Sequence, residues 1–222
     1  MRWIDRCIEA HSRPKQQHLF GIVQGGLDAR LRDLCLEGLV SRNLPGYAIG
    51  GLSGGESKDS FWRVVSQCAS KLPENKPRYL MGVGYAVDLV VCSALGVDMF
   101  DCVYPSRTAR FGTALVPTGT IHLKSSEFAK DYTPLDSTCN CMVCCKYTKA
   151  YLHTIVGKEQ LGAQLLTYHN IAYQMNLMKS LRNSLLQDNF VQFVLEFMKL
   201  QYPNNNYPKW TREALENAGI SL

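Results

Sequence analysis

The sequence predicts an α/β fold in which a parallel sheet is built from consecutive strand–helix units. Short β-type runs end in glycine-rich or polar turns, and helical patterns lie between these runs. The strand starts recur roughly 20 to 32 residues apart, which is typical of βα units in a parallel sheet.

Each of the four β-type runs stops at a turn signal. Gln24-Gly25-Gly26 follows the first run, residues 51–56 the second, residues 82–84 the third and Tyr104-Pro105 the fourth. We expect strands at residues 18–23, 47–50, 78–81 and 99–103.

Helical patterns precede and separate these strands. Leu31, Leu34 and Leu39 recur at helical spacing, and residues 87–95 are apolar almost all round, which indicates a buried helix. We expect helices at residues 2–11, 27–42, 58–72 and 87–95.

The number of strand–helix units limits the architecture. A complete (β/α)8 barrel needs roughly 250 residues of its own, whereas only about four units fit in this chain of 222 residues. The alternatives are a small open sheet and half of a barrel. The helix-like stretch at residues 2–11 favours the second, so we expect the chain to begin within a domain. The prediction is the C-terminal half of a TIM barrel, strands five to eight, in residues 1–118.

The pattern changes after the fourth strand. Residues 108–121 are rich in Thr, Val, Phe and Gly and contain Pro117-Thr118-Gly119, which predicts an inserted hairpin. A cysteine cluster comes next. We expect the helices that follow at residues 146–156, 160–181, 190–200 and 210–217.

Composition excludes several classes of protein. Hydrophobic residues make up 46% and charged residues 19%, which excludes a disordered or fibrous chain. The longest apolar stretches have about 8 residues, whereas a membrane-spanning helix needs roughly 20. No signal peptide is recognisable, so the nine cysteines are expected to be reduced and intracellular. The net charge of +5 permits a nucleic-acid partner without requiring one.

The cysteine cluster has the spacing of a metal site. Cys139, Cys141 and Cys144 form a C-x-C-x-x-C motif, and His169 follows Cys144 by 25 residues within a helical stretch. Three thiolates and one imidazole make a tetrahedral zinc set without an open position, which predicts one structural Zn²⁺ per chain. We therefore expect residues 119–222 to form a zinc-binding subdomain with C-terminal helices.

Alternatives to this ligand set remain open at the level of sequence. The cysteines would be free thiols or disulfides in a simpler interpretation. His153 lies nearer to the motif than His169, and Cys145 could replace Cys144. His122 precedes the cluster and is interpreted as a side chain of the hairpin.

The turns after the strands offer the chemistry of a ligand site. Ligands bind at the carboxyl ends of parallel strands. Gln24 brings an amide, Gly50-Gly51-Leu52 brings exposed backbone N–H groups, Met81 suits the face of a flat ring, and Asp101 brings a carboxylate. Each feature alone is equally explained as a turn or a cap. Together they predict a pocket for a heterocycle.

The segment after Asp101 suggests RNA. Arg107 and Arg110 are three residues apart, among hydroxyl side chains and next to Tyr104. These residue types suit phosphate contacts and base recognition in single-stranded RNA, and a solvated loop is the simpler alternative.

These motifs together resemble the tRNA-guanine transglycosylases, and most closely the catalytic subunits of the eukaryotic members. The resemblance extends from residue 2 to the end of the chain and includes the zinc set. The other four motifs are G-I-V-Q-G-G at 21–26, A-I-G-G-L-S-G-G-E at 48–56, Y-L-M-G-V-G at 79–84 and D-M-F-D-C-V-Y-P-S-R-T-A-R at 98–110.

The resemblance implies a pentosyltransferase that replaces guanine with queuine at the wobble position of the tRNAs for Asp, Asn, His and Tyr. Asp101 would be the nucleophile that attacks the ribose C1′ and forms a covalent ribosyl-enzyme. Gln24 and Gly51 would bind the base, with Gly50 and Leu52 beside them, and Met81 would stack on it. Gly54 would leave room for the bulky arm of queuine.

Two segments would contact the RNA. They comprise Gly82, Val83, Gly84, Tyr85, Ala86, Val87 and Asp88, and then Ser106, Arg107, Thr108, Ala109 and Arg110. The resemblance also implies an accessory subunit in a heterodimer, and a cytoplasmic location that includes association with the mitochondrial outer membrane.

The chain departs from the family pattern in one respect. The family has a second aspartate in a D-S-G-G-F type motif that acts as general acid/base, and another aspartate that reads the base; no such motif occurs here. The alternatives to a catalytic subunit are therefore a non-catalytic tRNA-binding or scaffolding subunit and an inactive fragment. An unrelated zinc protein with a small α/β sheet is the third interpretation.

Overall fold

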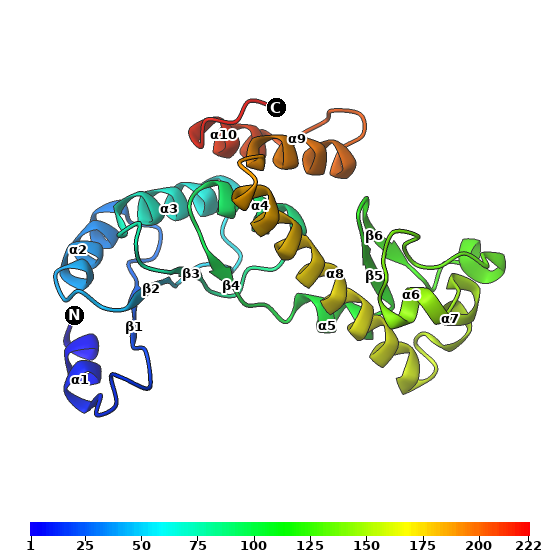
Figure 1. The fold of residues 1–222 in the computed structure, drawn as a ribbon, viewed down its shortest axis with the longest axis horizontal. Coiled ribbons are helices and arrows are strands. Elements are labelled where there is room, and N and C mark those ends of the chain that lie inside the picture. The colour runs from blue at the N-terminus through cyan, green and yellow to red at the C-terminus, as the bar shows by residue number, and fades with distance from the viewer. The chain divides into compact units, whose positions relative to one another are not determined.

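A computed structural model describes all 222 residues, and the chain divides into two compact units (Figure 1). Unit 1 comprises residues 1–84, 88–102 and 208–222, and unit 2 comprises residues 85–87 and 103–207. None of the helices combines the length and the apolar composition that a membrane crossing requires.

Unit 1 is built around a parallel sheet of four strands in sequential order. The strands are β1 (Phe20–Val23), β2 (Gly46–Ile49), β3 (Arg78–Leu80) and β4 (Met99–Phe100). Each strand pairs with the next, so that Phe20 faces Gly46, Tyr47 faces Arg78, and Tyr79 faces Met99. The predicted α/β fold with a parallel sheet is confirmed.

Side chains cap the first turn of two helices in unit 1. Asp28 accepts a hydrogen bond from the Leu31 N–H at 3.0 Å, and Ser57 accepts one from the Ser60 N–H at 3.1 Å. The helices are α1 (Arg2–Ala10), α2 (Ala29–Val40), α3 (Lys58–Lys71), α4 (Ala86–Ala94), which starts in unit 2, and α10 (Lys209–Asn217). In Figure 1, α2 and α3 lie along one face of the sheet.

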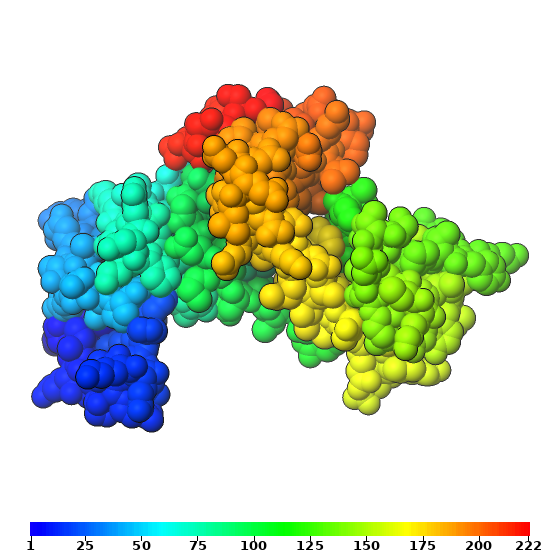
Figure 2. Space-filling view, viewed as in Figure 1, coloured from blue at the N-terminus to red at the C-terminus, as the bar shows by residue number.

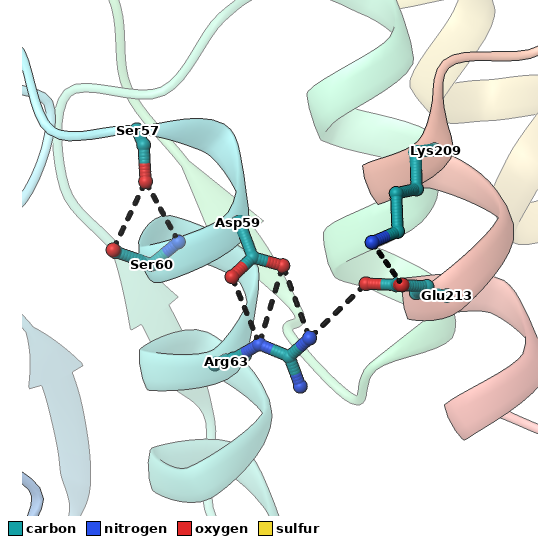
Figure 3. A network of polar contacts seen from close by, with 6 residues as sticks. All are labelled: Ser57, Asp59, Ser60, Arg63, Lys209 and Glu213. Carbon is teal, nitrogen blue, oxygen red and sulfur yellow. Dashed lines mark hydrogen bonds and ion pairs between the residues drawn. The ribbon is translucent and has the colours of Figure 1, made fainter.

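A polar network joins α10 to α3 (Figure 3). The Arg63 guanidinium lies 3.0 Å from both Asp59 and Glu213, and Lys209 lies 3.4 Å from Glu213. Exposed ion pairs of this kind contribute about 0–1 kcal/mol each. Phe61 of α3 and Leu215 of α10 are buried, so the burial of apolar side chains stabilises these helices more than the charges do.

Unit 2 contains an antiparallel hairpin and a set of helices. The hairpin strands β5 (Thr113–Val116) and β6 (Gly119–His122) turn at Pro117 and Thr118, as predicted. The helices are α5 (Tyr104–Arg110), the 3-10 helix η1 (Ser126–Lys130), α6 (Met142–Lys146), α7 (Lys149–Ile155), α8 (Gln160–Leu186) and α9 (Phe190–Gln201). Their shared core includes Leu123, Val143, Leu152 and Leu166.

Several predicted boundaries were wrong. β4 has two residues instead of five, so Asp101 follows the strand. The segment around Arg107 is the helix α5 and not a loop or part of the hairpin, because Pro105 sits in its first turn, where a missing N–H costs nothing. The helix predicted at 146–156 is α7, which begins at Lys149, and the separate helix α6 ends at Lys146. The helix α8 extends five residues beyond the predicted end at 181.

Candidate active site and metal centre

The carboxyl ends of β1 and β2 bring Gln24 against the glycine turn. A Cβ atom placed on Gly50 would lie 2.9 Å from the Gln24 Nε2, and one on Gly51 would lie 2.7 Å from the Gln24 Oε1. Gly51 also has a φ of +71°, a backbone conformation that residues with a side chain rarely adopt. The amide of Gln24 therefore occupies the space that a larger residue at either position would fill.

The two glycines do not offer equivalent donors. The Gly50 N–H donates to the Val23 carbonyl at 3.0 Å, so it continues the sheet and is buried. This corrects the expectation that both glycine N–H groups are exposed. Gly51 is exposed, and Leu52 beside it is half-buried.

A buried arginine fixes this turn from behind. Arg32 of α2 is 0% exposed, and its guanidinium donates to the carbonyl oxygens of Gly26 at 2.8 Å and Gly50 at 2.9 Å. A third, longer bond of 3.4 Å reaches the Val23 carbonyl. Because all these acceptors are backbone atoms at the ends of β1 and β2, Arg32 determines how the two turns meet.

Asp101 is an exposed carboxylate held by one of its oxygens. Its Oδ1 accepts a hydrogen bond from the Tyr79 hydroxyl at 2.5 Å and one from the Gly82 N–H at 2.9 Å. Both donors come from the end of β3 and the turn after it. The Oδ2 accepts no hydrogen bond from another residue, so it is the oxygen available for chemistry.

These donors keep Asp101 ionised. The hydrogen bond from Tyr79 and then the one from Gly82 lower the pKa of Asp101, because both favour the charged form. The same bond raises the pKa of Tyr79 to about 12, since the hydroxyl would lose its acceptor on ionising. The arrangement is a fixed anion with an uncharged donor beside it.

The turn after β2 is held by Glu56. Its two carboxylate oxygens accept from the Ser53 N–H at 2.7 Å and the Gly54 N–H at 2.9 Å. Partial burial opposes ionisation of Glu56, but these backbone donors outweigh it and lower the pKa. Ser53 has a φ of +62°, and a Cβ atom placed on Gly54 would meet no atom within 4 Å, so the space beside Gly54 is open.

Met81 and the segment after it divide into exposed and buried positions. Met81 is half-buried at the end of β3, and its N–H donates to the Ile49 carbonyl at 3.3 Å. Gly82 and Tyr85 are exposed, and Ala86 and Val87 are half-buried. The remaining members of the predicted RNA segment, Val83, Gly84 and Asp88, are buried.

The side chain of Asp88 is buried and forms an ion pair within the chain. Its carboxylate pairs with the Lys58 ammonium, which lies 5.0 Å from the Phe61 ring centre and 5.4 Å from that of Trp210. Burial raises the pKa of Asp88 in spite of the lysine. The side chain of Asp88 is therefore not exposed for the RNA contact that the resemblance implies.

The second predicted RNA segment forms α5 of unit 2. Arg107 and Arg110 are exposed on this helix, and neither pairs with a carboxylate of the chain. Ser106 and Thr108 bond to backbone oxygens of their own helix region, and Ala109 is buried. The two arginines are thus the members of this segment that face solvent.

Asn170 anchors α5 and β5 to α8. This side chain is 0% exposed, its Nδ2 donates to the carbonyl oxygens of Pro105 and Thr113 at 3.0 Å each, and its Oδ1 accepts from the Leu115 N–H at 2.9 Å. One amide therefore joins three elements. Nothing in the sequence pattern singled it out.

The four predicted metal ligands converge in unit 2. The ligand atoms of Cys139, Cys141, Cys144 and His169 all lie within 4.8 Å of one another. The His169 Nδ1 lies 3.5 Å from the Cys141 Sγ and 3.3 Å from the Cys144 Sγ. Its other nitrogen, Nε2, donates to the Leu115 carbonyl at 2.8 Å, which directs the Nδ1 lone pair toward the sulfurs.

The chemistry of this set fits a cation. Burial lowers the pKa of His169, which keeps the imidazole neutral as a ligand must be. Burial and the neighbouring sulfurs raise the pKa of the Cys144 thiol, so bringing thiolates this close requires a positive ion between them. Three sulfurs and one nitrogen suit Zn²⁺ and leave no open position.

The structure places the alternative ligands that the sequence left open outside the cluster, and it contains no disulfide. Cys145 is exposed and outside the cluster. His153 bonds through its Nδ1 to the Leu123 carbonyl at 2.6 Å, and His122 lies in β6, 3.0 Å from the Thr113 hydroxyl. All nine cysteines are free of disulfides.

Comparison with known proteins gives one family. The family model described as "Queuine tRNA-ribosyltransferase" matches residues 1–203. A "Queuine tRNA-ribosyltransferase catalytic subunit" of Schizosaccharomyces pombe is 52% identical over 232 residues, covering 100% of this chain and 57% of the relative. The "Queuine tRNA-ribosyltransferase catalytic subunit" of Caenorhabditis elegans is 46% identical over 237 residues, covering 100% of this chain and 59% of the relative.

A bacterial relative gives the same result. A "Queuine tRNA-ribosyltransferase" of Thermus thermophilus is 44% identical over 220 residues, covering 99% of this chain and 57% of the relative. The chain thus spans somewhat less than three fifths of the length of the curated relatives that it matches.

Proposed function

Because the chain belongs to the queuine tRNA-ribosyltransferase family, we propose that it carries the nucleophile and the base-binding turns of a tRNA base exchange. In this reaction guanine at the anticodon wobble position is replaced by queuine. The observation that carries the proposal is the Asp101 carboxylate, which is ionised, exposed and held by Tyr79 and Gly82 through one oxygen only.

Asp101 attacks the ribose. The Oδ2 forms a bond to C1′ as the bond between C1′ and N9 of guanine breaks, and the base leaves with the electron pair. The negative carboxylate stabilises the positive charge that develops at C1′. Attack by the incoming base on C1′ then releases Asp101, and the two inversions give net retention.

The base binds at the ends of the neighbouring strands. Gln24 and Gly51 hydrogen-bond its edge, with Gly50 and Leu52 shaping the turn, and the Met81 side chain covers its face. The open space beside Gly54 accommodates the cyclopentenediol arm of queuine. Arg32 has a positioning role, because it holds the carbonyl oxygens of both turns.

The remaining assignments concern the assembly. Arg107 and Arg110 contact tRNA phosphates, and the exposed residues of the 82–88 segment contact the same RNA. The Cys139, Cys141, Cys144 and His169 set holds one structural Zn²⁺. Residues 1–118 form half of a barrel, strands five to eight, and 119–222 the zinc-binding subdomain. The tRNAs for Asp, Asn, His and Tyr, an accessory subunit and a cytoplasmic or mitochondrial-surface location complete the proposal.

Departure of guanine requires a proton, which the family resemblance assigns to an aspartate in a motif that these 222 residues lack. A test of the nucleophile alone avoids this requirement. We would present the chain with an anticodon stem-loop RNA carrying 7-methylguanine at the wobble position. This base is cationic in the nucleoside and leaves as a neutral molecule without protonation.

We expect a covalent protein–RNA adduct on denaturing gels with the unaltered chain. Asp101→Asn should form none while it binds the RNA with unchanged affinity. Asp98→Asn is the matched control, because Asp98 is also exposed and also accepts a backbone N–H, from Arg78 at 2.8 Å. RNA binding without any adduct in the unaltered chain would instead support the non-catalytic, tRNA-binding alternative.

A further inference from the structure

A shallow groove in unit 2 lies between α5 and one face of α8. It has a volume of about 500 Å³ and is lined by Arg110, Gln160, Ala163, Gln164, Thr167, Tyr168 and Ile171. The α8 residues recur at three- and four-residue spacing, so they share one face of the helix. In Figure 2 the yellow residues of α8 form part of the molecular surface.

The groove combines an apolar wall with exposed polar ends. Tyr168 is 50% exposed and Ile171 47% exposed, and their three-residue spacing places both on the face of α8 that lines the groove. Gln160 and Gln164 are exposed, and their side-chain amides form no hydrogen bond within the chain. A flat aromatic or heterocyclic group fits such a surface better than water does.

The charge of the groove identifies the kind of partner. Arg110 is the only charged residue in the lining, and it pairs with no carboxylate of the chain. An anionic partner with flat rings matches an arginine, a half-exposed tyrosine and two free amides. Arg107 lies one helical turn before Arg110 on α5, so the groove continues the surface that already carries the proposed phosphate contacts.

We propose that this groove binds single-stranded RNA, with the Tyr168 ring stacked on an unpaired base and Arg110 on a neighbouring phosphate. Gln160 and Gln164 then contact base edges or the 2′-hydroxyl groups. The proposal rests on the tRNA base exchange argued above, and within unit 2 it adds a face of α8 to the RNA contacts proposed for α5. A protein occupant would be expected to present acidic residues to Arg110 and an apolar side chain to Tyr168.

Tyr168 lies next to the metal ligand His169, so the test separates stacking from folding. The unaltered chain, Tyr168→Ala, Tyr168→Phe and Tyr132→Ala would be compared for zinc content, for circular dichroism and for affinity toward an anticodon stem-loop RNA. Tyr132→Ala is the matched control, because Tyr132 is 76% exposed in the same unit and is not part of the groove.

We expect Tyr168→Ala to weaken RNA binding roughly 5- to 150-fold, the range for loss of one base–aromatic stack. Tyr168→Phe keeps the ring and should bind within about twofold of the unaltered chain, as should Tyr132→Ala. Arg110→Ala should reduce the slope of log K against log salt by about 0.7, the value for one phosphate contact on a single strand.

Equal affinity of Tyr168→Ala and the unaltered chain would overturn the inference and leave the proposed function intact. No RNA binding by the unaltered chain would overturn both. A photoreactive phenylalanine analogue at position 168 gives an independent measurement. Cross-linking to the RNA supports the inference, whereas cross-linking to a second copy of the chain in the presence of RNA contradicts it.

Discussion

Replacing Asn170 by leucine tests how unit 2 holds the proposed RNA-binding helix. Leucine has a similar size but no polar atoms. The change removes two hydrogen bonds that Asn170 donates, to Pro105 and Thr113, and the one it accepts from the Leu115 N–H. The site is completely buried, so water cannot replace these partners.

The magnitude follows from what each backbone group loses. An orphaned buried N–H at Leu115 costs about 1–3 kcal/mol, and the two donated bonds contribute about 1 kcal/mol each. Burying the leucine methylene and methyl groups returns about 1 kcal/mol. We therefore expect the free energy of unfolding to fall by about 2–4 kcal/mol.

Urea unfolding of Asn170→Leu against the unaltered chain measures this loss, with Asn176→Leu as the matched control on the same helix. Asn176 is exposed, so its replacement should change the free energy of unfolding by less than about 0.5 kcal/mol. Pro105 belongs to the first turn of α5, so Asn170→Leu should also weaken binding of a stem-loop RNA. An unchanged midpoint together with unchanged RNA affinity would refute the anchoring role.

Three other substitutions test the site and the metal centre. Tyr79→Phe removes the donor that lowers the pKa of Asp101, so the acid limb of adduct formation should move to higher pH, and an identical pH–rate profile would contradict this. Cys141→Ser should purify with clearly less than one zinc per chain by metal analysis. It should also melt at a lower temperature, because structural zinc contributes folding free energy. A zinc content equal to that of the unaltered chain would contradict the ligand assignment. In a polypeptide competent for exchange, Gly54→Val should weaken queuine use far more than guanine exchange, and equal losses in a competition assay would show that Gly54 shapes the fold instead of the pocket.

Local patterns predicted most of the secondary structure. Glycine turns and apolar spacing identified the four strand–helix units, because these signals arise within one element and its ends. The spacing of Cys139, Cys141 and Cys144 predicted, for the same reason, a cluster that could hold a metal ion. The helix α5 was not predicted, although a proline such as Pro105 in the first turn is a known signal for the start of a helix.

The residues that position the site could not be predicted from one sequence. Arg32 reaches Gly50 across 18 residues, Tyr79 reaches Asp101 across 22, and Asn170 reaches Leu115 across 55. Each is an ordinary residue of a helix or strand until the fold supplies its partner. Their roles depend on tertiary contacts, which hydrophobic periodicity and motif spacing do not encode.

The position of the covalent bond tests the role of Asp101 directly. The adduct formed with the 7-methylguanine stem-loop would be digested with nuclease and protease, and the ribose-bearing peptide sequenced by mass spectrometry. We expect a ribosyl ester on Asp101, released by hydroxylamine and absent from Asp101→Asn. A ribosyl group on any other side chain, or an equal yield of adduct from Asp101→Asn, would contradict it.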